Sequence, residues 1–306
     1  MINLTQFIQD RIRNPNLTEA LAAVLADIAA ACREISRAID KGALTGAMGS
    51  QGGKNVQGEE QKKLDVISND LFLAFLQRSG HVMGLVSEEM EAPFIPHVKD
   101  AEASAKYLVL FDPLDGSSNV DVNISVGTIF SILPAQTAPA TVESFLQPGT
   151  AQLCAGYAIY GSSTMLVLTT GHGTHGFTLD RDTGEFLLSH PAMQISPETQ
   201  EFAVNMSNYR FWEASMQHYV DDCLVGKDGR RGKDFNMRWI ASAVAEVHRI
   251  LIRGGVFLYP IDSKNRKQGG RLRLMYEANP LGFVVEQAGG AASTGRKRIM
   301  DIAPNA

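Results

Sequence analysis

The first clear pattern along the chain is a helical one near the N-terminus. From Leu17 to Ile39 the apolar residues recur every three or four positions, at 17, 21, 24, 25, 28, 32, 35 and 39, and so share one face of a helix. Asn16 stands where a cap is expected, with Glu19 at the third helical position and Gly42 just past the end. The pattern predicts a long amphipathic helix, and Cys32 on its apolar face is expected to be a core residue.

The segment from 42 to 58 is rich in glycine and holds almost no large apolar residue. Such a segment can contribute little to a core, so we expect a mobile loop there. It lacks the Gly-Lys-Ser/Thr ending and the preceding strand of a nucleotide P-loop, which argues against that kind of site. Helical periodicity returns at 64–75, which places Asp65 near the start of a second helix.

The rest of the first half is a series of short runs rich in β-branched and aromatic residues, each predicted to be a strand. These runs are 82–87, 107–111, 126–133, 156–160, 165–170 and a hairpin at 176–189, with Asp182-Thr183-Gly184 as its turn.

The second half, from about residue 195, mixes both periodicities. We expect strands at 202–204, 256–259 and 272–275, and helices at 211–224, 238–252 and 280–288. Asn279 as cap and Pro280 at the first position are typical signals for the start of the last helix. In the first half, helices come first and strands after them, which favours a layered α/β or α+β fold.

Composition narrows the class of protein. Of 306 residues, 44% are hydrophobic and 20% charged, as in ordinary globular proteins. The 28 Lys and Arg against 33 Asp and Glu give a net charge of -5, which argues against nucleic acid or an anionic membrane as the main partner. The odd and widely spaced cysteines (Cys32, Cys154 and Cys223) favour a reducing cytoplasm over a disulfide framework, and we expect neither a secretory signal nor a membrane span.

Acidic residues follow two of the predicted strands. The run 82–87 leads into Glu88 and Glu89, and the run 107–111 leads into Asp112 and Asp115. If the two strands are neighbours in one sheet, these four carboxylates converge at one edge, where they could not all ionise without cations between them. Hard divalent cations such as Mg²⁺ or Mn²⁺ take oxygen ligands of this kind.

The stretch 112–118 adds a second kind of site. Its Asp-Pro-Leu-Asp turn can aim Asp112, Asp115 and the Leu114 carbonyl at one point, and 116–118 (Gly-Ser-Ser) offers N–H groups and hydroxyls for a phosphate. Metal and phosphate sites side by side favour phosphoryl chemistry, in which metals neutralise phosphate oxygens and a carboxylate takes a proton from water. The alternative for each piece alone is a solvated strand end and an ordinary turn.

Other polar clusters leave two interpretations open. Arg253, Lys264, Arg266, Lys267, Arg271 and Arg273 form a basic cluster around Tyr259. A solvated loop is the favoured interpretation for 264–267, whereas Arg271 and Arg273, alternating on a short predicted strand, are equally consistent with a phosphate contact. His172 and His175 favour a turn or surface role over metal binding.

Several longer motifs resemble class I fructose-1,6-bisphosphatases, and the resemblance extends over nearly the whole chain. They are Lys-Lys-Leu-Asp (62–65), Val-Ser-Glu-Glu (86–89), Phe-Asp-Pro-Leu-Asp-Gly-Ser-Ser-Asn (111–119), Ser-Val-Gly-Thr-Ile-Phe-Ser (125–131), Val-His-Arg (247–249), Gly-Gly-Val-Phe-Leu-Tyr-Pro (254–260) and Leu-Arg-Leu-Met-Tyr-Glu-Ala-Asn-Pro (272–280). The resemblance implies the layered αβαβα sandwich of the sugar phosphatase superfamily. It also implies a metal-binding and regulatory-type sub-domain at 1–194 and a sugar-phosphate-binding sub-domain at 195–306.

The resemblance also implies roles for individual residues. Mg²⁺ ions, with Mn²⁺ as a possible substitute, would be held by Glu88, Asp112, the Leu114 carbonyl, Asp115 and Glu277. Glu89 and Asp65 would activate the attacking water. Substrate would be bound by Asp115, Gly116, Ser117, Ser118, Asn205, Tyr209, Tyr259 and Arg271, with Arg238 reaching over from a neighbouring subunit of a homotetramer. The segment 42–63 would close over the metals.

The implied reaction is Mg²⁺-dependent hydrolysis of the 1-phosphate of fructose 1,6-bisphosphate, in gluconeogenesis or the Calvin cycle. Two alternatives remain: an enzyme that acts on sedoheptulose 1,7-bisphosphate or on both sugars, and a catalytically silent sugar-phosphate sensor. The complete acidic set argues against the sensor.

The sequence departs from the better-known members of the family in three respects. Arg271 stands in place of Lys, and Trp239 in place of Tyr, which keeps a ring but loses a hydroxyl contact to phosphate. The stretches at 13–18 and 133–134 lack the Gly-Thr-Gly-Glu-like turn and the Arg found in members that AMP inhibits, so we expect weak AMP inhibition or none. The cysteine-bearing regulatory insertion of the chloroplast type is also missing.

Overall fold

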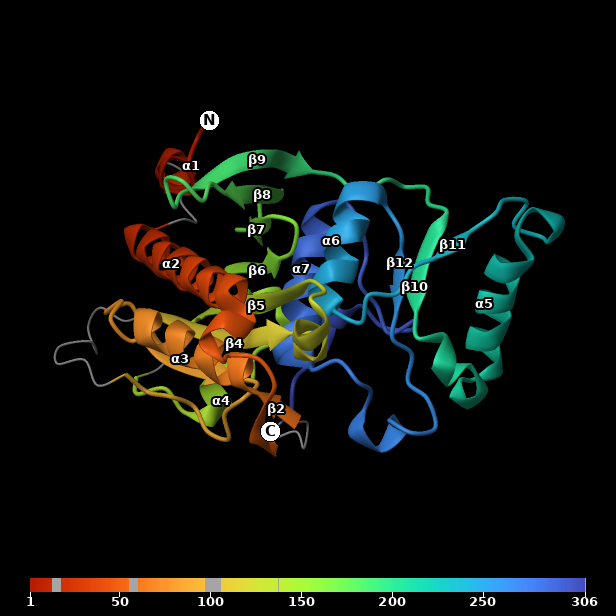
Figure 1. The fold of residues 1–306 in the computed structure, drawn as a ribbon, viewed down its shortest axis with the longest axis horizontal. Coiled ribbons are helices and arrows are strands. Elements are labelled where there is room, and N and C mark those ends of the chain that lie inside the picture. The colour runs from red at the N-terminus through yellow and green to blue at the C-terminus, as the bar shows by residue number, and fades with distance from the viewer. Residues whose placement is uncertain (13–17, 55–59, 97–105, 137, 306) are drawn as a thin grey trace.

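The computed structural model describes residues 1–12, 18–54, 60–96, 106–136 and 138–305 (Figure 1). Its largest element is a seven-stranded sheet in the order β3-β4-β5-β6-β7-β8-β9. The strands are β3 (Val82–Ser87), β4 (Tyr107–Asp115), β5 (Val126–Pro134), β6 (Cys154–Tyr160), β7 (Thr164–Thr169), β8 (Thr174–Leu179) and β9 (Phe186–Met193). Neighbours are antiparallel except β3 and β4, which are parallel.

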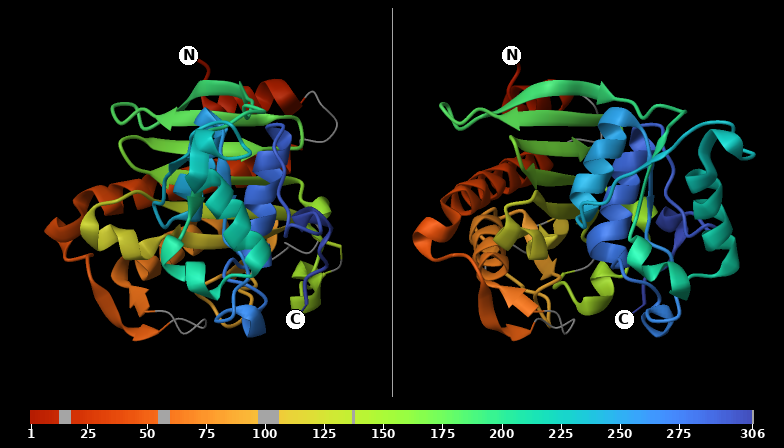
Figure 2. Two further views of the ribbon diagram at one scale, coloured as in Figure 1. Left: turned by 90° about the vertical axis from the view of Figure 1, so that its right-hand side faces the viewer. Right: turned by 45° about the vertical axis from the view of Figure 1, so that its right-hand side comes forward.

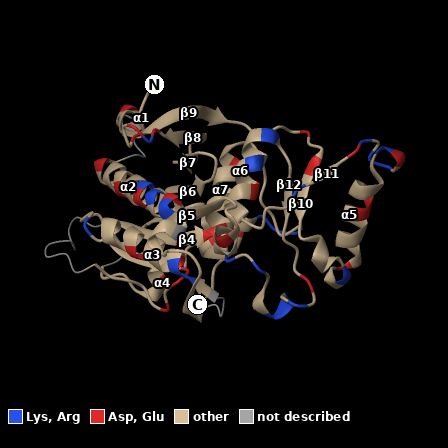
Figure 3. Cartoon of the chain, viewed as in Figure 1, with Lys and Arg blue, Asp and Glu red and all other residues tan. Residues whose placement is uncertain are grey.

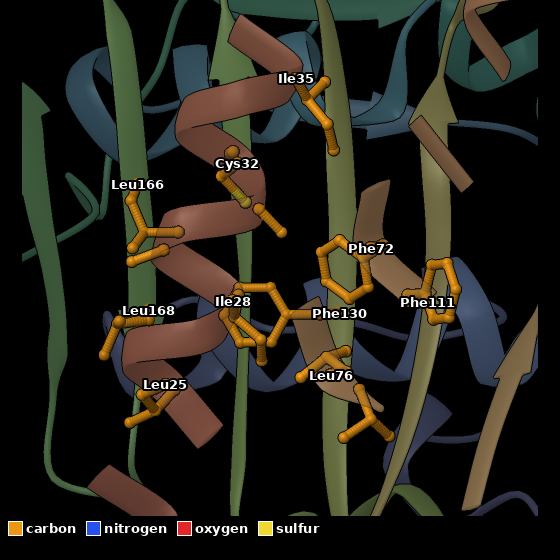
Figure 4. Packing of buried hydrophobic residues seen from close by; sticks show 14 of the residues in the cluster. Leu25, Ile28, Cys32, Ile35, Phe72, Leu76, Phe111, Phe130, Leu166 and Leu168 are labelled. Carbon is orange, nitrogen blue, oxygen red and sulfur yellow. The ribbon is translucent and has the colours of Figure 1, made fainter. Parts of the chain in front are cut away.

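Helices cover both faces of this sheet. On one face lie α2 (Glu19–Lys41) and α3 (Lys63–Leu76), and on the other lie α6 (Ala243–Arg253) and α7 (Asn279–Gln287) (Figure 1). Because both faces are covered, β4, β6 and β7 are buried along their whole length and read as continuous apolar runs instead of alternating ones. Figure 4 shows Ile28 of α2 over Phe130, Cys32 one turn further along α2, and Phe72 of α3 beside Phe111.

A second, smaller sheet lies beyond α6 and α7. It holds β10 (Glu201–Val204) between β11 (Asn236–Met237) and β12 (Val256–Leu258), all parallel. The amphipathic helix α5 (Ala214–Val225) packs on its outer face, where Val220 and Cys223 meet Phe202 and Val204. The layers therefore run helix, sheet, helix, sheet, helix, as Figures 1 and 2 show, and the predicted αβαβα sandwich is confirmed.

Shorter elements complete the chain. The helix α1 (Leu4–Ile12) lies beside β9 near the N-terminus, where the Leu188 N–H donates to the Ile2 carbonyl at 2.8 Å (Figure 2). The other short elements are α4 (Val142–Phe145), β1 (Ser50–Lys54) and β2 (Glu60–Lys62). Among the described residues, no helix combines the length and apolarity that a membrane span requires.

The long N-terminal helix begins later than the apolar pattern predicts. It starts at Glu19, and the Thr18 hydroxyl caps it by accepting the Leu21 N–H at 3.1 Å. The prediction of Asn16 as cap is therefore wrong, and Asn16 itself lies outside the described residues. A capping side chain must stand immediately before the first helical residue, and Thr18 meets that condition. The predicted end at Gly42 and the burial of Cys32 are confirmed.

The glycine-rich segment is more regular than the loop that we expected. A 3₁₀ turn at Gly42–Thr45 leads into β1, which pairs antiparallel with β2; residues 55–59 between them lie outside the described part. Asp121 ties this hairpin down, accepting the Gly49 N–H at 3.0 Å and facing Lys62 Nζ at 3.2 Å. The strands were missed because they carry no apolar alternation to signal them.

Four predictions in the second half also differ from the structure. The predicted strand at 272–275 is wrong, because Leu274–Ala278 forms a π-helix that continues directly into α7. Asn279 is consequently the first residue of α7, not its cap. The helix predicted over 238–252 begins at Ala243 after the cap Ser242. The helix predicted over 211–224 begins at Ala214, after a 3₁₀ turn at Met206–Phe211.

Candidate active site

The acidic ends of β3 and β4 lie side by side, as the sequence predicts. The two strands are parallel with Ser87 opposite Phe111, and the Glu88 N–H continues the pairing by donating to the Phe111 carbonyl at 3.1 Å. Glu88 therefore lies next to Asp112, and both side chains are buried. Figure 3 shows the acidic residues gathered at this end of β4, where α6 begins.

A bulge in β4 explains how Asp112 and Asp115 serve one site. Residues three apart in a regular strand point to opposite faces of the sheet. Here Asp112 pairs with Ile129 but Asp115 pairs with Gly127, so β4 has one residue more than β5 over this stretch. The extra residue turns both carboxylates to the same side. The hydroxyl of Thr128 donates to the Pro113 carbonyl at 2.8 Å and satisfies an acceptor inside the bulge.

Glu277 joins these two acids from the second half of the chain. Carboxylate oxygens of Asp112, Asp115 and Glu277 all lie within 4.8 Å of one another, and all three side chains are buried. Burial, with the charges of Glu88, Asp115 and Glu277, raises the pKa of Asp112 well above its ordinary value. Burial and the charge of Asp115 raise the pKa of Glu277 to about 8. The cluster is therefore poised to take up protons or a cation.

Asp115 is held by the N-terminus of α6. The Ser242 hydroxyl donates to its Oδ2 at 2.6 Å, and the backbone N–H groups of Ala243 and Val244 donate at 3.2 and 2.9 Å. A helix N-terminus favours an anion because its first N–H groups have no partner within the helix. Burial still raises the pKa of Asp115 overall, although these three hydrogen bonds oppose the rise.

Gly116 is required where the site turns away from β4. Its φ is +75°, and a Cβ at this position would lie 2.7 Å from the Cβ of Ser242. The close approach lets Ser242 reach Asp115. Ser117, half-buried, and Ser118, exposed, follow at the start of a 3₁₀ turn, Ser117–Val122.

The two acids implied as activators of water also lie together. Asp65 is buried in the first turn of α3 and accepts the Lys62 N–H at 2.7 Å. Burial raises its pKa to about 7, and the charge of Glu89 adds to the rise, while Lys62 and the Ser117 hydroxyl oppose it. Glu89 is half-buried and accepts a hydrogen bond from Gln61 Nε2 at 2.6 Å, which connects β2 to the site.

Arg273 supplies positive charge within this acidic cluster. Its Nη2 lies 2.8 Å from Glu88 Oε1, its Nη1 lies 4.0 Å from Glu277, and its backbone N–H donates to Glu277 at 2.5 Å. The interpretation of Arg273 as a residue of a short strand beside Arg271 is wrong, because 271–273 form no strand and Arg273 stands directly before the π-helix Leu274–Ala278. The π-helix that follows it places Arg273 against the acids.

The donor set fits a divalent cation. All three clustered groups are carboxylates, the ligands that Mg²⁺ and Mn²⁺ prefer. Because all three are buried, three uncompensated negative charges so close together would be strongly unfavourable. One arginine offsets only part of that charge. The residues present can therefore hold a metal. The geometry agrees with the metal centre that the acidic residues after the two strands predict at this sheet edge.

Three residues implied in sugar binding, Asn205, Tyr209 and Tyr259, come after strands of the smaller sheet. Asn205 follows the end of β10 and Tyr259 follows the end of β12, so both stand at the carboxyl edge of parallel strands. The Asn205 side chain accepts from the Ser207 N–H and hydroxyl at 3.2 and 2.6 Å. The Tyr209 hydroxyl donates to Asp221 at 2.9 Å.

The basic residues noted in the sequence do not form one cluster. Arg253 contacts Glu201, Arg266 contacts Glu213, and Arg273 contacts Glu88. Arg271 is exposed. Arg238 lies in the extended stretch between β11 and α6, where its Nε donates to Glu201 at 3.0 Å.

Comparisons with known proteins agree on one family. The family model for the N-terminal domain of fructose-1,6-bisphosphatase matches residues 2–191, and the model for the C-terminal domain matches 195–306. The chain belongs to the class 1 fructose-1,6-bisphosphatase family. It is 58% identical to fructose-1,6-bisphosphatase class 1 3 of Methylibium petroleiphilum, over 98% of this chain and 85% of that one. It is 56% identical to the class 1 enzyme of Methylobacillus flagellatus, over 99% and 91%.

Solved structures of the fructose-1,6-bisphosphatase family agree with the fold. The holo form of the Leishmania major enzyme has a TM-score of 0.91 and 38% identity, covering 99% of this chain and 91% of that one. The apo form of the same enzyme has a TM-score of 0.86 and 36% identity, covering 100% and 92%. The family is one of metal-dependent hydrolases in carbohydrate metabolism, in keeping with the buried acids described above.

One departure from the fructose-1,6-bisphosphatase pattern has a structural counterpart. Trp239 packs in an aromatic cluster, with ring centroids 5.8 Å from Tyr259 and 6.2 Å from Phe257. The indole thus fills the space beside Tyr259 through ring contact, without the hydroxyl that a tyrosine would add.

Sequence reasoning missed three groups that shape the site. Ser242 and the N-terminus of α6 bind Asp115, Arg273 faces Glu88, and Gln61 binds Glu89. A serine before an apolar helical run is an ordinary cap signal, so Ser242 could have been found as a cap. Its contact with Asp115 spans 127 residues of sequence, and no local pattern signals that.

Proposed function

We propose that the chain hydrolyses the 1-phosphate of fructose 1,6-bisphosphate to give fructose 6-phosphate and phosphate, with Mg²⁺ as its metal and Mn²⁺ as a possible substitute. The activity is that of the fructose-1,6-bisphosphatase family, to which the chain belongs. The observation that carries the proposal is the buried cluster of Asp112, Asp115 and Glu277 beside Glu88. A catalytically silent sensor would have no need to keep such a costly group of acids.

The metal would be held by Glu88, Asp112, the Leu114 carbonyl, Asp115 and Glu277. When bound, divalent cations supply neutralisation of phosphate oxygens and a lower pKa for the attacking water. Ser242 and the α6 N-terminus keep Asp115 oriented, and the N–H of Leu114 donates to Asp112 at 3.0 Å. These hydrogen bonds fix the carboxylates before the substrate arrives.

Glu89 and Asp65 would take up the proton of the attacking water. Glu89 is half-buried and is oriented by Gln61, so it can accept a proton from water at the edge of the site. Asp65 has a pKa of about 7, which suits it to exchange protons near neutral pH. Gly116, Ser117 and Ser118 would meet the phosphate that leaves, together with Asp115.

The second half would hold the rest of the sugar. Asn205, Tyr209, Tyr259 and Arg271 are the proposed contacts, and Arg238 would reach the second phosphate from a neighbouring subunit of a homotetramer. In this view 1–194 is the metal-binding sub-domain and 195–306 the sugar-phosphate sub-domain. The contact between Gln61 and Glu89 supports the proposal that the segment 42–63 closes over the metals.

Two further features of the proposal concern control and location. We expect weak AMP inhibition or none, and strong inhibition at micromolar AMP would contradict that expectation; residues 13–17, on which it partly rests, lie outside the described part. A cytoplasmic location is supported by three buried cysteines that are all free thiols.

The substrate can be tested by phosphate release from fructose 1,6-bisphosphate and sedoheptulose 1,7-bisphosphate, side by side, with and without Mg²⁺. The proposal expects Mg²⁺-dependent turnover of the fructose substrate with the higher kcat/KM. A higher value for the sedoheptulose substrate would replace fructose by sedoheptulose in the assignment. No turnover of either, in a folded protein that binds them, would favour the sensor.

The base can be tested with Glu89→Gln. Substrate affinity should stay nearly unchanged while turnover falls by orders of magnitude, because the amide cannot accept the proton. Turnover near that of the wild type would remove Glu89 from the role of base.

A further inference from the structure

Glu201, at the start of β10, gathers three arginines. Its side chain is buried, and it accepts hydrogen bonds from Arg238 Nε at 3.0 Å, Arg249 Nη1 at 3.0 Å and Arg253 Nη2 at 2.5 Å. Burial alone would raise the pKa of Glu201, but the hydrogen bonds from Arg238 and Arg249 and the charge of Arg253 hold it below its ordinary value. Glu201 therefore carries a full negative charge at neutral pH.

The three arginines differ in how far their charge is compensated. Arg249 is 8% exposed and also binds the buried Glu246, so it is enclosed between two carboxylates. Arg238 and Arg253 share the other oxygen of Glu201, and their side chains are 47% and 55% exposed. Two carboxylates thus face three guanidinium groups, and the surplus positive charge resides on the exposed pair.

Arg238 and Arg253 lie close to each other. Arg238 Nε and Arg253 Nη2 lie 3.0 and 2.5 Å from the same oxygen of Glu201, so the two nitrogens are close to each other. Two like charges this close are favourable only when anions offset both. Among the described contacts Arg238 uses only Nε and Arg253 only Nη2, which leaves further N–H groups of each for a second acceptor.

Arg238 and Arg253 do not lie at the edge of the smaller sheet where the proposed sugar-binding residues of the same chain are found. Asn205 and Tyr259 follow the carboxyl ends of the parallel strands β10 and β12, whereas Glu201 is the first residue of β10. Asn205 comes four positions after Glu201, which is about 13 Å of extended chain. Figure 3 shows basic residues at the far end of α6 near acidic residues at the start of β10. An arginine tied to Glu201 is therefore directed away from those sugar contacts.

We infer that Arg253 is a second phosphate-binding residue, which Glu201 holds beside Arg238 so that the two together bind the phosphate that stays on the sugar in the active site of another copy of this chain. The inference rests on the proposed function and adds Arg253 and Glu201 to it. Two guanidinium forks match the oxygens of a phosphate dianion better than one. Glu201 is a positioning residue, because it would touch the arginines and not the substrate.

The first experiment compares Arg253→Gln with Arg181→Gln. Arg181 is a matched control, since it is also 55% exposed and bound to one carboxylate, that of Asp40. For Arg253→Gln we expect KM for fructose 1,6-bisphosphate and Ki for fructose 6-phosphate to rise about tenfold, the equivalent of about 1.4 kcal/mol, with kcat within about twofold. Glu201→Gln should also raise this KM and this Ki, and Arg181→Gln should change neither constant.

Arg253→Lys guards against a loss of folding. It keeps the charge without the fork and should give a KM between the wild type and Arg253→Gln. Unchanged KM and Ki in Arg253→Gln would overturn the inference. An equal rise in Ki for fructose 6-phosphate and for fructose, which carries no phosphate, would also overturn it.

The second experiment asks whether Arg253 acts on another copy. Subunits of Arg253→Gln, which keep Glu89, are mixed with subunits of Glu89→Gln, which keep Arg253. Hybrids should show the low KM of the wild type, because the site that keeps Glu89 in one subunit receives Arg253 from the other. Mixing Arg253→Gln with the double variant Glu89→Gln/Arg253→Gln should leave KM as high as in Arg253→Gln alone. A low KM in both mixtures, or in neither, would overturn action between copies.

The failure of the proposed function looks different. If the wild type did not hydrolyse fructose 1,6-bisphosphate, the reaction assignment would fail. Calorimetric binding of fructose 6-phosphate to wild type and Arg253→Gln would still test the arginine pair. A tenfold weaker binding to the variant would support it, and equal binding would overturn it.

Discussion

The hydroxyl of Ser242 donates to Oδ2 of Asp115 at 2.6 Å, and this one hydrogen bond joins the metal-site strand β4 to the first turn of α6. Ser242 is also the cap of α6, accepting the Ala245 N–H at 3.2 Å. The same hydroxyl group thus stabilises the helix and orients a carboxylate of the acidic cluster. Fold and site are coupled at this residue.

Removing the Ser242 hydroxyl should affect both the stability of the fold and the binding of Mg²⁺. Ser242→Ala is expected to lower the free energy of unfolding by about 1–2 kcal/mol, the usual cost of a lost cap, and to weaken Mg²⁺ binding several-fold because Asp115 loses a partner. Thr18→Ala is the matched control, since Thr18 caps α2 but touches no acid of the site. Denaturant unfolding and metal titration would measure the two effects. Equal loss of Mg²⁺ affinity in both variants would contradict the coupling.

Gly116 tests the close approach behind the same contact. Gly116→Ala should greatly reduce turnover, because a Cβ would lie 2.7 Å from that of Ser242 and the φ of +75° is unfavourable for alanine. Gly295→Ala separates the two causes: Gly295 has φ +82° but no atom within 4 Å of its Cβ position. Both variants should lose about 1 kcal/mol of stability to the backbone. A variant Gly116→Ala with wild-type turnover would show that the site tolerates displacement of Ser242.

The raised pKa values predict how pH acts on the metal-free protein. Glu277 and Asp65, with pKa values of about 8 and about 7, bind protons more tightly folded than unfolded. Their contribution to stability is therefore greatest in acid and is lost as pH rises through about 7–8. After chelation, Tm should fall between pH 5.5 and 8.5. The increase in Tm on adding Mg²⁺ should be larger at pH 8.5, and a larger increase at pH 5.5 would contradict the metal assignment.

Gln61 offers a test of how the hairpin β1–β2 acts on the base. Gln61→Ala removes the donor that lies 2.6 Å from Glu89, so kcat should fall about threefold to tenfold with little change in KM. Gln61→Glu should cost more, because it places a like charge beside the base. Steady-state kinetics distinguish these outcomes. A rise in KM alone would mean that Gln61 acts on the substrate and not on Glu89.

How far the sequence predicts this site depends on the distance over which each contact forms. Glu88 follows β3 and Asp112 lies near the end of β4, and because these strands pair directly, the proximity of the two acids could be predicted from local patterns. Glu277 entered only through the family resemblance, because no local signal connects a residue at 277 with one at 112. The contacts of Ser242 and Arg273 depend on the packing of distant elements and could not be predicted from periodicity at all.

The errors in secondary structure have physical causes of the same kind. Alternating Arg and Leu at 271–275 imitates a strand, but the chain there winds into a π-helix in which Glu277 can reach the acids. The hairpin β1–β2 buries little, so its strands rest on backbone pairing that apolar periodicity does not register. The long helix and the buried strands were predicted well because burial imposes its period on their sequences.

The central claim is that the buried acids form a metal centre at which fructose 1,6-bisphosphate loses its 1-phosphate. The most direct measurement is phosphate release from fructose 1,6-bisphosphate by the purified protein as isolated, after complete chelation, and after Mg²⁺ is restored, for the wild type and Asp112→Asn. We expect activity to vanish on chelation, to return with Mg²⁺ in the wild type, and to stay at least a hundredfold lower in Asp112→Asn. Phosphate release that persists without metal, or full activity in Asp112→Asn, would contradict the account.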